Sequence, residues 1–310
     1  MAVNMKGKDL ISIADLSIEE IYEIFDVAKS LKQKLYTNEP HRLLEGKTLG
    51  MIFTKRSTRT RVSFEVGIYQ LGGIGMYFGP NDLQLGVSES ISDTAKVLSR
   101  YLNGIMIRTF AHSDVVELAK YADIPVINGL TDLLHPCQVL TDLFTILEKK
   151  RTLQGLKLAY IGDGNNMAHS LLNGCSKVGM NIAIASPSGY KPNEEIVKNA
   201  LKFASYMGSR IEILEDPVQA VKNADIVYTD VWASMGQESE ALERKKKFAS
   251  FQVNPELVKN AKDDYLFMHC LPAHRGEEVV DEVADSPNSV IFDEAENRLH
   301  VQKAIMALVM

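Results

Sequence analysis

The most informative stretch of this sequence is Phe53-Thr54-Lys55-Arg56-Ser57-Thr58-Arg59-Thr60-Arg61, which holds four cations and four hydroxyls. It follows an apolar run at 48–53 that predicts a buried strand, and a helical pattern continues from Thr58. Ser57 then stands at the N-cap position. The first turn of a helix offers backbone N–H groups, so an anion bound there would meet amides, hydroxyls and guanidinium groups together. The stretch predicts a phosphate site, and the alternative is a capped surface helix with solvated arginines.

The composition is that of an ordinary globular protein with room for two domains. The 310 residues exceed the size at which a single hydrophobic core stops growing, about 250 to 300 residues. A net charge of -6 argues against nucleic acid as the main partner. No apolar run approaches the roughly 20 residues that cross a membrane, and the first residues lack an apolar signal core. Three cysteines without metal-ligand spacing suit free thiols in a reducing cytoplasm, so we expect a cytoplasmic protein without a bound metal: Cys137, Cys175 and Cys270.

Strand-like apolar runs alternate with helical patterns along the chain, which predicts parallel sheets with crossover helices. Ser17 and Glu20 form a capping box, with Leu16 and Ile21 as its hydrophobic staple, and open a helix that runs to about Tyr36. The charged run 148–151 predicts an exposed boundary between two units. Between the phosphate stretch and that boundary we expect strands at 75–78, 104–107 and 125–128 and helices at 92–102, 113–122 and 136–149.

The second half restarts with a strand at 156–161, followed by Gly162-Asp163-Gly164-Asn165-Asn166-Met167. A dinucleotide fingerprint would need glycine in place of Met167, and an acidic residue should close the strand at 182–185, where Ser186 stands. Both supports are missing, so no cofactor is expected. Further strands are predicted at 210–214, 225–228, 265–268 and 289–292. Ligands bind beyond the carboxyl ends of parallel strands, which nominates the segments 163–166, 230–235 and 269–272.

Two further features of the first half point to the same sheet edge as the phosphate stretch. Arg108 ends the strand at 104–107, and His135-Pro136-Cys137-Gln138 opens the helix after the fourth strand. Pro136 suits the first turn of that helix and by itself would be ordinary punctuation. The three features together favour a site for a small anion.

Four motifs of this sequence carry a family resemblance: Ser57-Thr58-Arg59-Thr60-Arg61, His135-Pro136-Cys137-Gln138, Asp230-Val231-Trp232-Ala233-Ser234-Met235-Gly236 and His269-Cys270-Leu271-Pro272-Ala273. They resemble the motifs of the aspartate/ornithine carbamoyltransferase superfamily, and most closely its ornithine-using branch. The resemblance covers essentially the whole chain. It implies an α/β fold with two doubly wound parallel-sheet domains and the active site in the cleft between them. A carbamoyl-phosphate domain would span 1–150, an ornithine domain 151–293, and a C-terminal helix at about 294–310 would cross back to the first domain.

The resemblance also implies which residues hold the two substrates. Ornithine would be held through its α-amino and carboxylate groups by Asn166, Asp230, Ser234 and Met235. Gln84 would come from a neighbouring subunit, so the protein would be a homo-oligomer, either a trimer or an assembly of trimers. Carbamoyl phosphate would contact a larger set, namely Ser57, Thr58, Arg59, Thr60, Gln84, Arg108, His135, Gln138, Cys270, Leu271 and Arg298.

Catalysis, by the same resemblance, would depend on five of these residues. Thr60, Arg108 and His135 would polarise the carbonyl oxygen as it gains charge, and Asp230 would pair with the α-ammonium group of ornithine. Cys270 would lie near the reacting amine, where its thiolate or nearby carbonyls would orient the amine or help to remove its proton. The amine would attack directly, so no covalent enzyme intermediate is implied.

Plain structural interpretations stay open for several of these residues. Cys270 alone would more often be a small buried hydrophobe, Asp230 a strand-end cap and Asn166 a helix cap. The run 243–247 is best interpreted as a solvated helix face. Four histidines are left with structural roles: His112, His169, His274 and His300.

Other functions also stay open. The loop 81–86 lacks the lysine that an aspartate-using relative should carry, and putrescine would not need the loop with Ser234 and Met235. These two features favour ornithine over aspartate and putrescine as the acceptor. The remaining alternatives are another amine as acceptor, either putrescine or an acylated ornithine, or a catalytically silent anion-binding protein of the same fold.

Overall fold

The computed structural model describes residues 3–83, 89–233 and 240–310, and the chain divides into two compact units. Unit 1 comprises Met1–Thr141 and Glu296–Met310, and unit 2 comprises Asp142–Ala295. The division falls inside helices α5 (Pro136–Lys150) and α12 (Ile291–Val309), so each of these helices belongs to both units. The sequence predicted a boundary at 148–151, which is the C-terminal end of α5.

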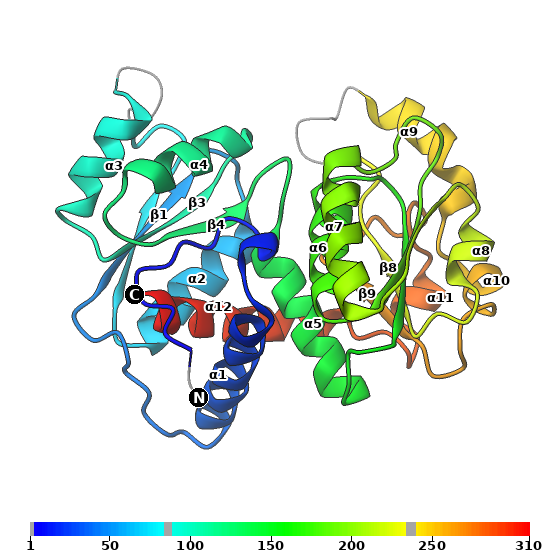
Figure 1. The fold of residues 1–310 in the computed structure, drawn as a ribbon, viewed down its shortest axis with the longest axis horizontal. Coiled ribbons are helices and arrows are strands. Elements are labelled where there is room, and N and C mark those ends of the chain that lie inside the picture. Colours follow the sequence, from blue (N-terminus) through cyan, green and yellow to red (C-terminus); the bar gives the residue numbers. More distant parts are fainter. Residues whose placement is uncertain (1–2, 84–88, 234–239) are drawn as a thin grey trace. The chain divides into compact units, whose positions relative to one another are not determined.

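Unit 1 contains a parallel four-stranded sheet in the order β2-β1-β3-β4. Its helices cover both faces of the sheet: α3 and α4 lie on one side, and α1, α2 and α12 on the other (Figure 1). The strands are β1 (Thr48–Phe53), β2 (Ile74–Phe78), β3 (Gly104–Arg108) and β4 (Val126–Leu130). The helices before α5 are α1 (Ile18–Tyr36), α2 (Thr58–Gln70), α3 (Ile91–Ser99) and α4 (His112–Tyr121).

Apolar side chains explain the layering of unit 1. Ile52, Ile105 and Ile107 of the sheet pack in one buried cluster with Val115 and Leu118 of α4. On the other side, Gly67 of α2 permits a close approach to α12, because a Cβ at this position would lie 2.9 Å from Met306. The C-terminal helix therefore returns to unit 1, as the resemblance implied.

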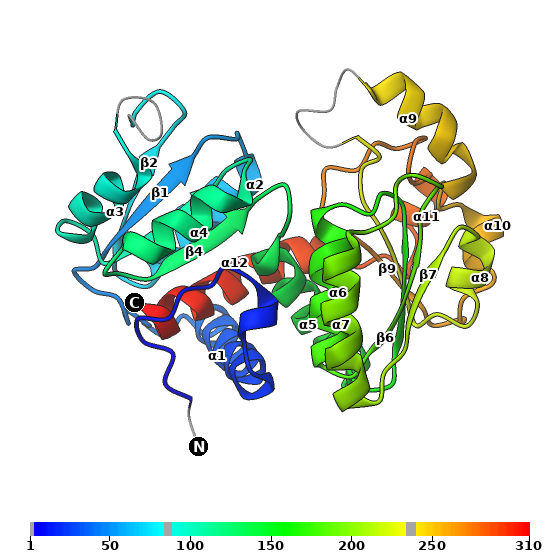
Figure 2. The same cartoon turned by 45° about the horizontal axis from the view of Figure 1, so that its top comes forward.

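Unit 2 contains a parallel five-stranded sheet in the order β7-β6-β5-β8-β9. Helices α6 and α7 lie on one side of it, and α8, α10 and α11 on the other (Figures 1 and 2). The strands are β5 (Lys157–Ile161), β6 (Asn181–Ala185), β7 (Ile211–Leu214), β8 (Ile226–Thr229) and β9 (Leu266–His269). The helices between α5 and α12 are α6 (Asn166–Lys177), α7 (Glu194–Met207), α8 (Pro217–Val221), α9 (Ala241–Phe248), α10 (Pro255–Val258) and α11 (Asp281–Ala284).

The glycine-rich turn after β5 is explained by packing inside unit 2. A Cβ on Gly164 would lie 2.3 Å from the backbone nitrogen of Pro192 and 2.4 Å from the carbonyl carbon of Lys191. No side chain fits there, because these neighbours are backbone atoms. Gly164 thus lets the turn lie directly against the 190–192 segment.

Most predicted elements are present, and the capping box of Ser17 and Glu20 is confirmed. The predicted strand at 289–292 is wrong: Ser289 makes an isolated bridge to Phe267, and α12 begins at Ile291. A short apolar run fits a strand or a helix equally well, and the acidic residues Asp293 and Glu294 suit the first turn of a helix. Within the described ranges, no helix is both long and apolar enough to cross a membrane.

Candidate active site

The candidate anion site of unit 1 lies at the carboxyl ends of β1 and β3, where the strand order reverses. Phe53 and Arg108 are register partners at the ends of these strands, so the residues after Phe53 lie beside Arg108. Ser57 caps α2, and its side-chain oxygen accepts a hydrogen bond from the backbone N–H of Thr60 at 3.2 Å. The predicted cap is confirmed, and the phosphate stretch passes into a helix N-terminus.

Thr60 is fully buried, and its hydroxyl joins three elements of unit 1. Oγ1 accepts hydrogen bonds from the Ser57 hydroxyl at 3.0 Å, from Arg108 Nη1 at 3.2 Å and from Arg298 Nη2 at 2.6 Å. Arg298, on α12, also donates from Nη1 to Gln138 Oε1 on α5 at 2.9 Å. Five predicted site residues from distant parts of the sequence therefore lie in one hydrogen-bonded cluster, which we call the Thr60 cluster: Ser57, Thr60, Arg108, Gln138 and Arg298.

His135 is buried, and its surroundings keep the imidazole neutral. Burial lowers the pKa of His135 well below its usual value, and the positive charges of Arg298, Arg108, Arg59 and Lys55 lower it further. A neutral imidazole is able to donate a hydrogen bond to a carbonyl oxygen without adding to the positive charge. Because these cations repel one another, an anion bound among them would relieve that repulsion.

The cations of the phosphate stretch do not all contribute to this cluster. Arg61 lies on the surface with its guanidinium group 3.9 Å from the Tyr77 ring centroid, whereas Arg59 is half-buried. Lys55 is buried and pairs with Asp132 at 2.9 Å. Successive residues of a helix point about 100° apart, so the alternation seen in the sequence is not kept in space. Of the other predicted phosphate contacts in this stretch, Ser57 is half-buried and Thr58 is exposed.

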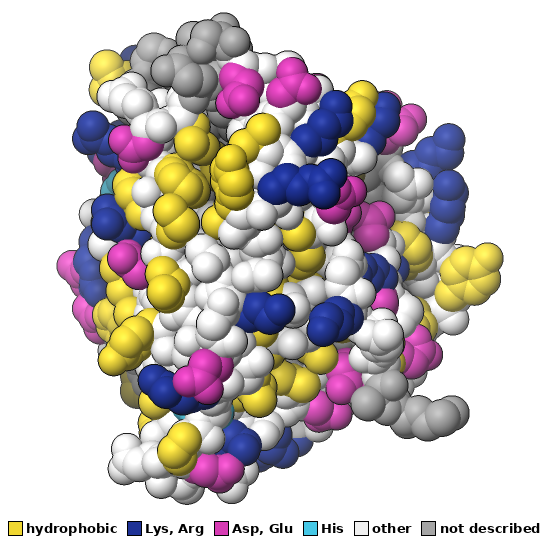
Figure 3. Space-filling view, turned by 90° about the vertical axis from the view of Figure 1, so that its left-hand side faces the viewer, with side chains coloured by type: hydrophobic (Ala, Val, Ile, Leu, Met, Phe, Trp, Pro, Cys, Tyr) yellow, Lys and Arg dark blue, Asp and Glu magenta, His cyan; other side chains and the backbone are white. Residues whose placement is uncertain are grey.

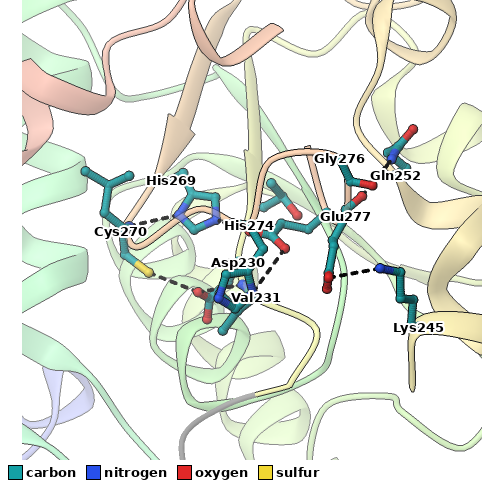
Figure 4. A network of polar contacts seen from close by, with 12 residues as sticks. Asp230, Val231, Lys245, Gln252, His269, Cys270, His274, Gly276 and Glu277 are labelled. Atoms are coloured by element: carbon teal, nitrogen blue, oxygen red, sulfur yellow. Dashed lines mark hydrogen bonds and ion pairs between the residues drawn. The ribbon is translucent and has the colours of Figure 1, made fainter. Parts of the chain in front are cut away.

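The candidate acceptor site of unit 2 lies at the carboxyl ends of β5 and β8, again where the strand order reverses. Asp230 directly follows β8 and is buried. Its Oδ2 accepts a hydrogen bond from Asn165 Nδ2 at 3.0 Å. Its Oδ1 accepts from the Cys270 thiol at 3.1 Å and from the backbone N–H of Val231 at 2.8 Å (Figure 4). The three donors are neutral groups, so they orient the carboxylate without cancelling its charge.

Cys270 directly follows β9, in a turn that is stabilised by hydrogen bonds of His269. The backbone N–H of Leu271 donates to His269 Nδ1 at 2.8 Å, and His269 Nε2 lies 3.2 Å from Glu278 Oε1. Leu271 has a positive φ of 57°, and its peptide bond to Pro272 is cis. The backbone N–H of His269 donates to the buried Glu294 Oε2 at 3.1 Å. These contacts fix the direction in which the Cys270 side chain points.

The surroundings of Cys270 favour the thiol over the thiolate. Burial raises the pKa of Cys270 well above its usual value, and the negative charges of Asp230 and Glu294 raise it further. The thiol therefore acts as a hydrogen-bond donor to Asp230 at neutral pH. The thiolate role that the sequence left open for Cys270 is disfavoured in this arrangement.

Asn165 lies in the nominated segment 163–166, but the sequence reasoning singled out Asn166 instead. Its Oδ1 accepts hydrogen bonds from the backbone N–H groups of Met167 and Ala168 and so caps α6, while its amide group orients Asp230. The cap role considered for Asn166 is wrong, because Asn166 is the first residue of the helix. The N-cap preference for asparagine applied to both residues and did not separate them. Gln84, Ser234 and Met235 lie outside the described residues.

Comparison with known proteins shows the family to which this chain belongs. Residues 8–148 match the family model described as the carbamoyl-P binding domain of aspartate/ornithine carbamoyltransferase, and residues 154–309 match its Asp/Orn binding domain. The chain belongs to the aspartate/ornithine carbamoyltransferase family. Arg298 lies in the stretch that the Asp/Orn model matches. It nevertheless belongs to unit 1 and to the Thr60 cluster, because α12 returns to that unit.

Individual family members are similar over the whole chain. The ornithine carbamoyltransferase of Thermococcus kodakarensis is 61% identical over 310 residues, which cover 100% of this chain and 98% of the relative. The protein named "Ornithine carbamoyltransferase, anabolic" from Pyrococcus furiosus is 59% identical over 310 residues, with 100% and 98% covered. A solved structure of the Pyrococcus furiosus ornithine carbamoyltransferase has a TM-score of 0.97 and covers 99% of this chain and 98% of its own.

Proposed function

We propose that this protein transfers the carbamoyl group of carbamoyl phosphate to the side-chain amine of L-ornithine, giving L-citrulline and phosphate. Family membership and relatives named for this activity at about 60% identity support the assignment. The observation that carries it in the structure is the Thr60 cluster at the N-terminus of α2, whose Arg108 and Arg298 help to keep the nearby His135 neutral. Such a cluster suits a small acyl phosphate.

The donor residues divide by the charge that each part of carbamoyl phosphate carries. Phosphate is the leaving group and needs cations and hydroxyls, for which we propose Ser57, Thr58, Arg59, Thr60, Gln138 and Arg298. The carbonyl oxygen gains negative charge as the amine attacks, and donors already in place stabilise that charge. We assign this role to Thr60, Arg108 and neutral His135, with Cys270 and Leu271 contacting the carbamoyl group.

The acceptor is assigned to the residues around Asp230. The side-chain amine of ornithine resembles that of lysine, with an ordinary pKa of roughly 10.4, so only about one molecule in 2,500 is neutral at pH 7. Selecting the neutral amine therefore costs about 4.6 kcal/mol. We propose that Asp230 pairs with the α-ammonium group, that Asn166, Ser234 and Met235 complete the contacts to the α-substituents, and that exclusion of water at the reacting end favours the neutral amine.

The exposed apolar surface of unit 1 supports the proposal that the protein forms a homo-oligomer. Tyr69 of α2 is 78% exposed and Ile74 of the edge strand β2 is 65% exposed, and Val62, Val66 and Met76 of the same two elements are also exposed. Figure 3 shows the side of the molecule that lies at the left in Figure 1, and apolar side chains gather over part of it. Such patches commonly mark contact sites between proteins. We propose a trimer, or an assembly of trimers, in the cytoplasm, with Gln84 completing the donor site of a neighbouring subunit.

Mixing Gln84→Ala and Arg59→Ala chains tests the shared site. Each variant alone is expected to be nearly inactive, whereas mixed oligomers are expected to regain part of the activity, because some sites then contain both native residues. Mixed oligomers that stay inactive would favour a site contained within one chain.

A citrulline assay tests the activity itself. The protein is incubated with carbamoyl phosphate and with ornithine, aspartate, putrescine or N-acetylornithine in parallel, and carbamoylated product is measured for each. We expect turnover with ornithine and little with the others. Product from another amine would replace ornithine as acceptor, and tight carbamoyl-phosphate binding without any turnover would support an anion-binding protein.

A further inference from the structure

Arg244 departs from the solvated helix face expected for the run 243–247. It lies on α9 and is 6% exposed, while its neighbours in the run, Lys245 to Lys247, are exposed. Its Nη1 donates to Asp163 Oδ2 at 2.8 Å and to the backbone carbonyl of Trp232 at 3.0 Å. Its Nε donates to Glu240 Oε2 at 3.0 Å. Interpreting the whole run as solvated is therefore wrong for Arg244.

The two buried partners of Arg244, Asp163 and the Trp232 carbonyl, belong to the segments that carry Asp230 and its amide donor. Asp163 belongs to the turn after β5, in which Asn165 donates a hydrogen bond to Asp230 at 3.0 Å. Trp232 lies two residues beyond Asp230 in the segment that leaves β8. One guanidinium group thus ties together the two segments that carry Asp230 and its amide donor.

We propose that the Arg244–Asp163 ion pair positions Asp230 for binding of the acceptor's ammonium group, so that Arg244 is a positioning residue for the amine substrate; this inference rests on the proposed function. Arg244 lies in unit 2 and makes none of the hydrogen bonds of the Thr60 cluster, so its effect should fall on the acceptor and leave the donor unchanged.

The chemistry of the pair explains why arginine is needed. Burial raises the pKa of Asp163, the Arg244 charge opposes that rise, and the nearby Asp230 charge adds to it. Without Arg244, two carboxyl groups would remain close together, and Asp163 would lose the cation that pairs with it. Lysine has no planar fork, so it would not reach Asp163, Trp232 and Glu240 from one side chain.

The surroundings of Arg244 also hold it in place. Its guanidinium carbon lies 4.9 Å from the centroid of the Tyr190 ring, and the Trp232 and Phe248 rings stack with centroids 6.0 Å apart. Removing one partner of a buried ion pair leaves an uncompensated charge, which makes the site sensitive to substitution.

Arg244→Gln is the test, with Lys245→Gln as its matched control. Lys245 is the next residue of the same helix and pairs with Glu277 at 3.0 Å on the exposed surface, where an ion pair contributes little. KM for ornithine, KM for carbamoyl phosphate, kcat and the melting temperature are measured for each. We expect Arg244→Gln to raise KM for ornithine at least tenfold and to change KM for carbamoyl phosphate less than twofold. Lys245→Gln should change every value less than twofold.

A second variant keeps the test decisive if Arg244→Gln does not fold. Asp163→Asn removes the charge but preserves an oxygen that accepts from Arg244, so we expect a several-fold rise in KM for ornithine alone. An unchanged KM for ornithine in a folded Arg244→Gln or, failing that, Asp163→Asn protein would overturn the inference, as would an equal rise for both substrates. A wild-type protein that forms no citrulline would instead overturn the proposed function, and the inference with it.

Discussion

Replacing Cys270 by serine and by alanine distinguishes a thiol that donates a hydrogen bond from a thiolate that accepts a proton. In the structure the Cys270 thiol donates to Asp230 Oδ1 at 3.1 Å. Burial and the charges of Asp230 and Glu294 raise the pKa of the thiol well above its usual value, so it remains protonated through the neutral range. Serine keeps a donor at this position, whereas alanine removes it and leaves Asp230 with one fewer partner.

The size of the effect follows from the kind of hydrogen bond that is lost. A hydrogen bond to a charged group contributes about 1.5 to 3 kcal/mol, and a thiol is a weak donor, so we take the lower value. About 1.4 kcal/mol corresponds to a tenfold change in an equilibrium constant. We therefore expect Cys270→Ala to lower kcat/KM for ornithine about tenfold and Cys270→Ser to lower it less than about threefold.

The assay is citrulline formation as a function of ornithine concentration from pH 6 to pH 10. Cys175→Ala serves as the control, because Cys175 is a buried thiol of α6 in the same unit, and it should leave kcat/KM close to that of the wild type. The donor role would be refuted if the serine variant were as slow as the alanine variant and if both variants lacked a rate increase that the wild type shows as its thiol titrates. That result would support a thiolate that acts as a base.

Three further predictions concern stability and the donor site. Lys303 is buried, and burial lowers its pKa to about 8. Lys303→Met should therefore raise the free energy of unfolding at pH 7 by up to about 3 kcal/mol. Urea titrations should show this gain shrinking between pH 8 and pH 10.5, because over that range the folded wild type loses a proton that the unfolded chain retains. Burial and Asp142 raise the pKa of Glu294, so wild-type stability should fall as the pH rises above about 4.5, and urea titrations of Glu294→Gln should lack that fall. Arg59→Ala should weaken carbamoyl-phosphate binding in calorimetry by roughly 3 kcal/mol, whereas Arg61→Ala, at the exposed position that pairs with Glu65, should leave it unchanged.

Local signals predicted most of the fold and placed the phosphate stretch, Arg108 and His135 at one sheet edge, whereas Arg298 was named only through the family resemblance. The bounds of β1 and the first residue of α2 were predicted correctly because an apolar strand, a serine cap and a helical pattern follow one another within a few residues. Arg108 and His135 were found because each stands at the end of its own strand or the start of its own helix. Their meeting at one sheet edge follows from the parallel topology.

The acceptor half-site was harder to predict because its contacts are made between distant segments. Arg244 stands in a run of charged residues that looks solvated, and only its pairing with Asp163, 81 positions away, makes it buried. Asn165 and Asn166 have the same side chain, and the sequence does not tell which one begins the helix. In both cases the deciding partner is absent from the local sequence.

The charges of the two half-sites suit different substrates. In unit 1 the positive charges around His135 favour an anion and disfavour the cationic acceptor. In unit 2 two carboxyl groups lie at the same sheet edge, and Arg244 pairs with Asp163, whereas the hydrogen-bond donors of Asp230 are an amide, a thiol and a backbone N–H. An ammonium group therefore gains most by approaching Asp230, since a carboxylate that already has a cation beside it attracts a second cation less strongly. On our proposal, Arg244 thus leaves Asp230 as the more attractive of the two carboxylates, and ornithine would direct its α-ammonium group to it.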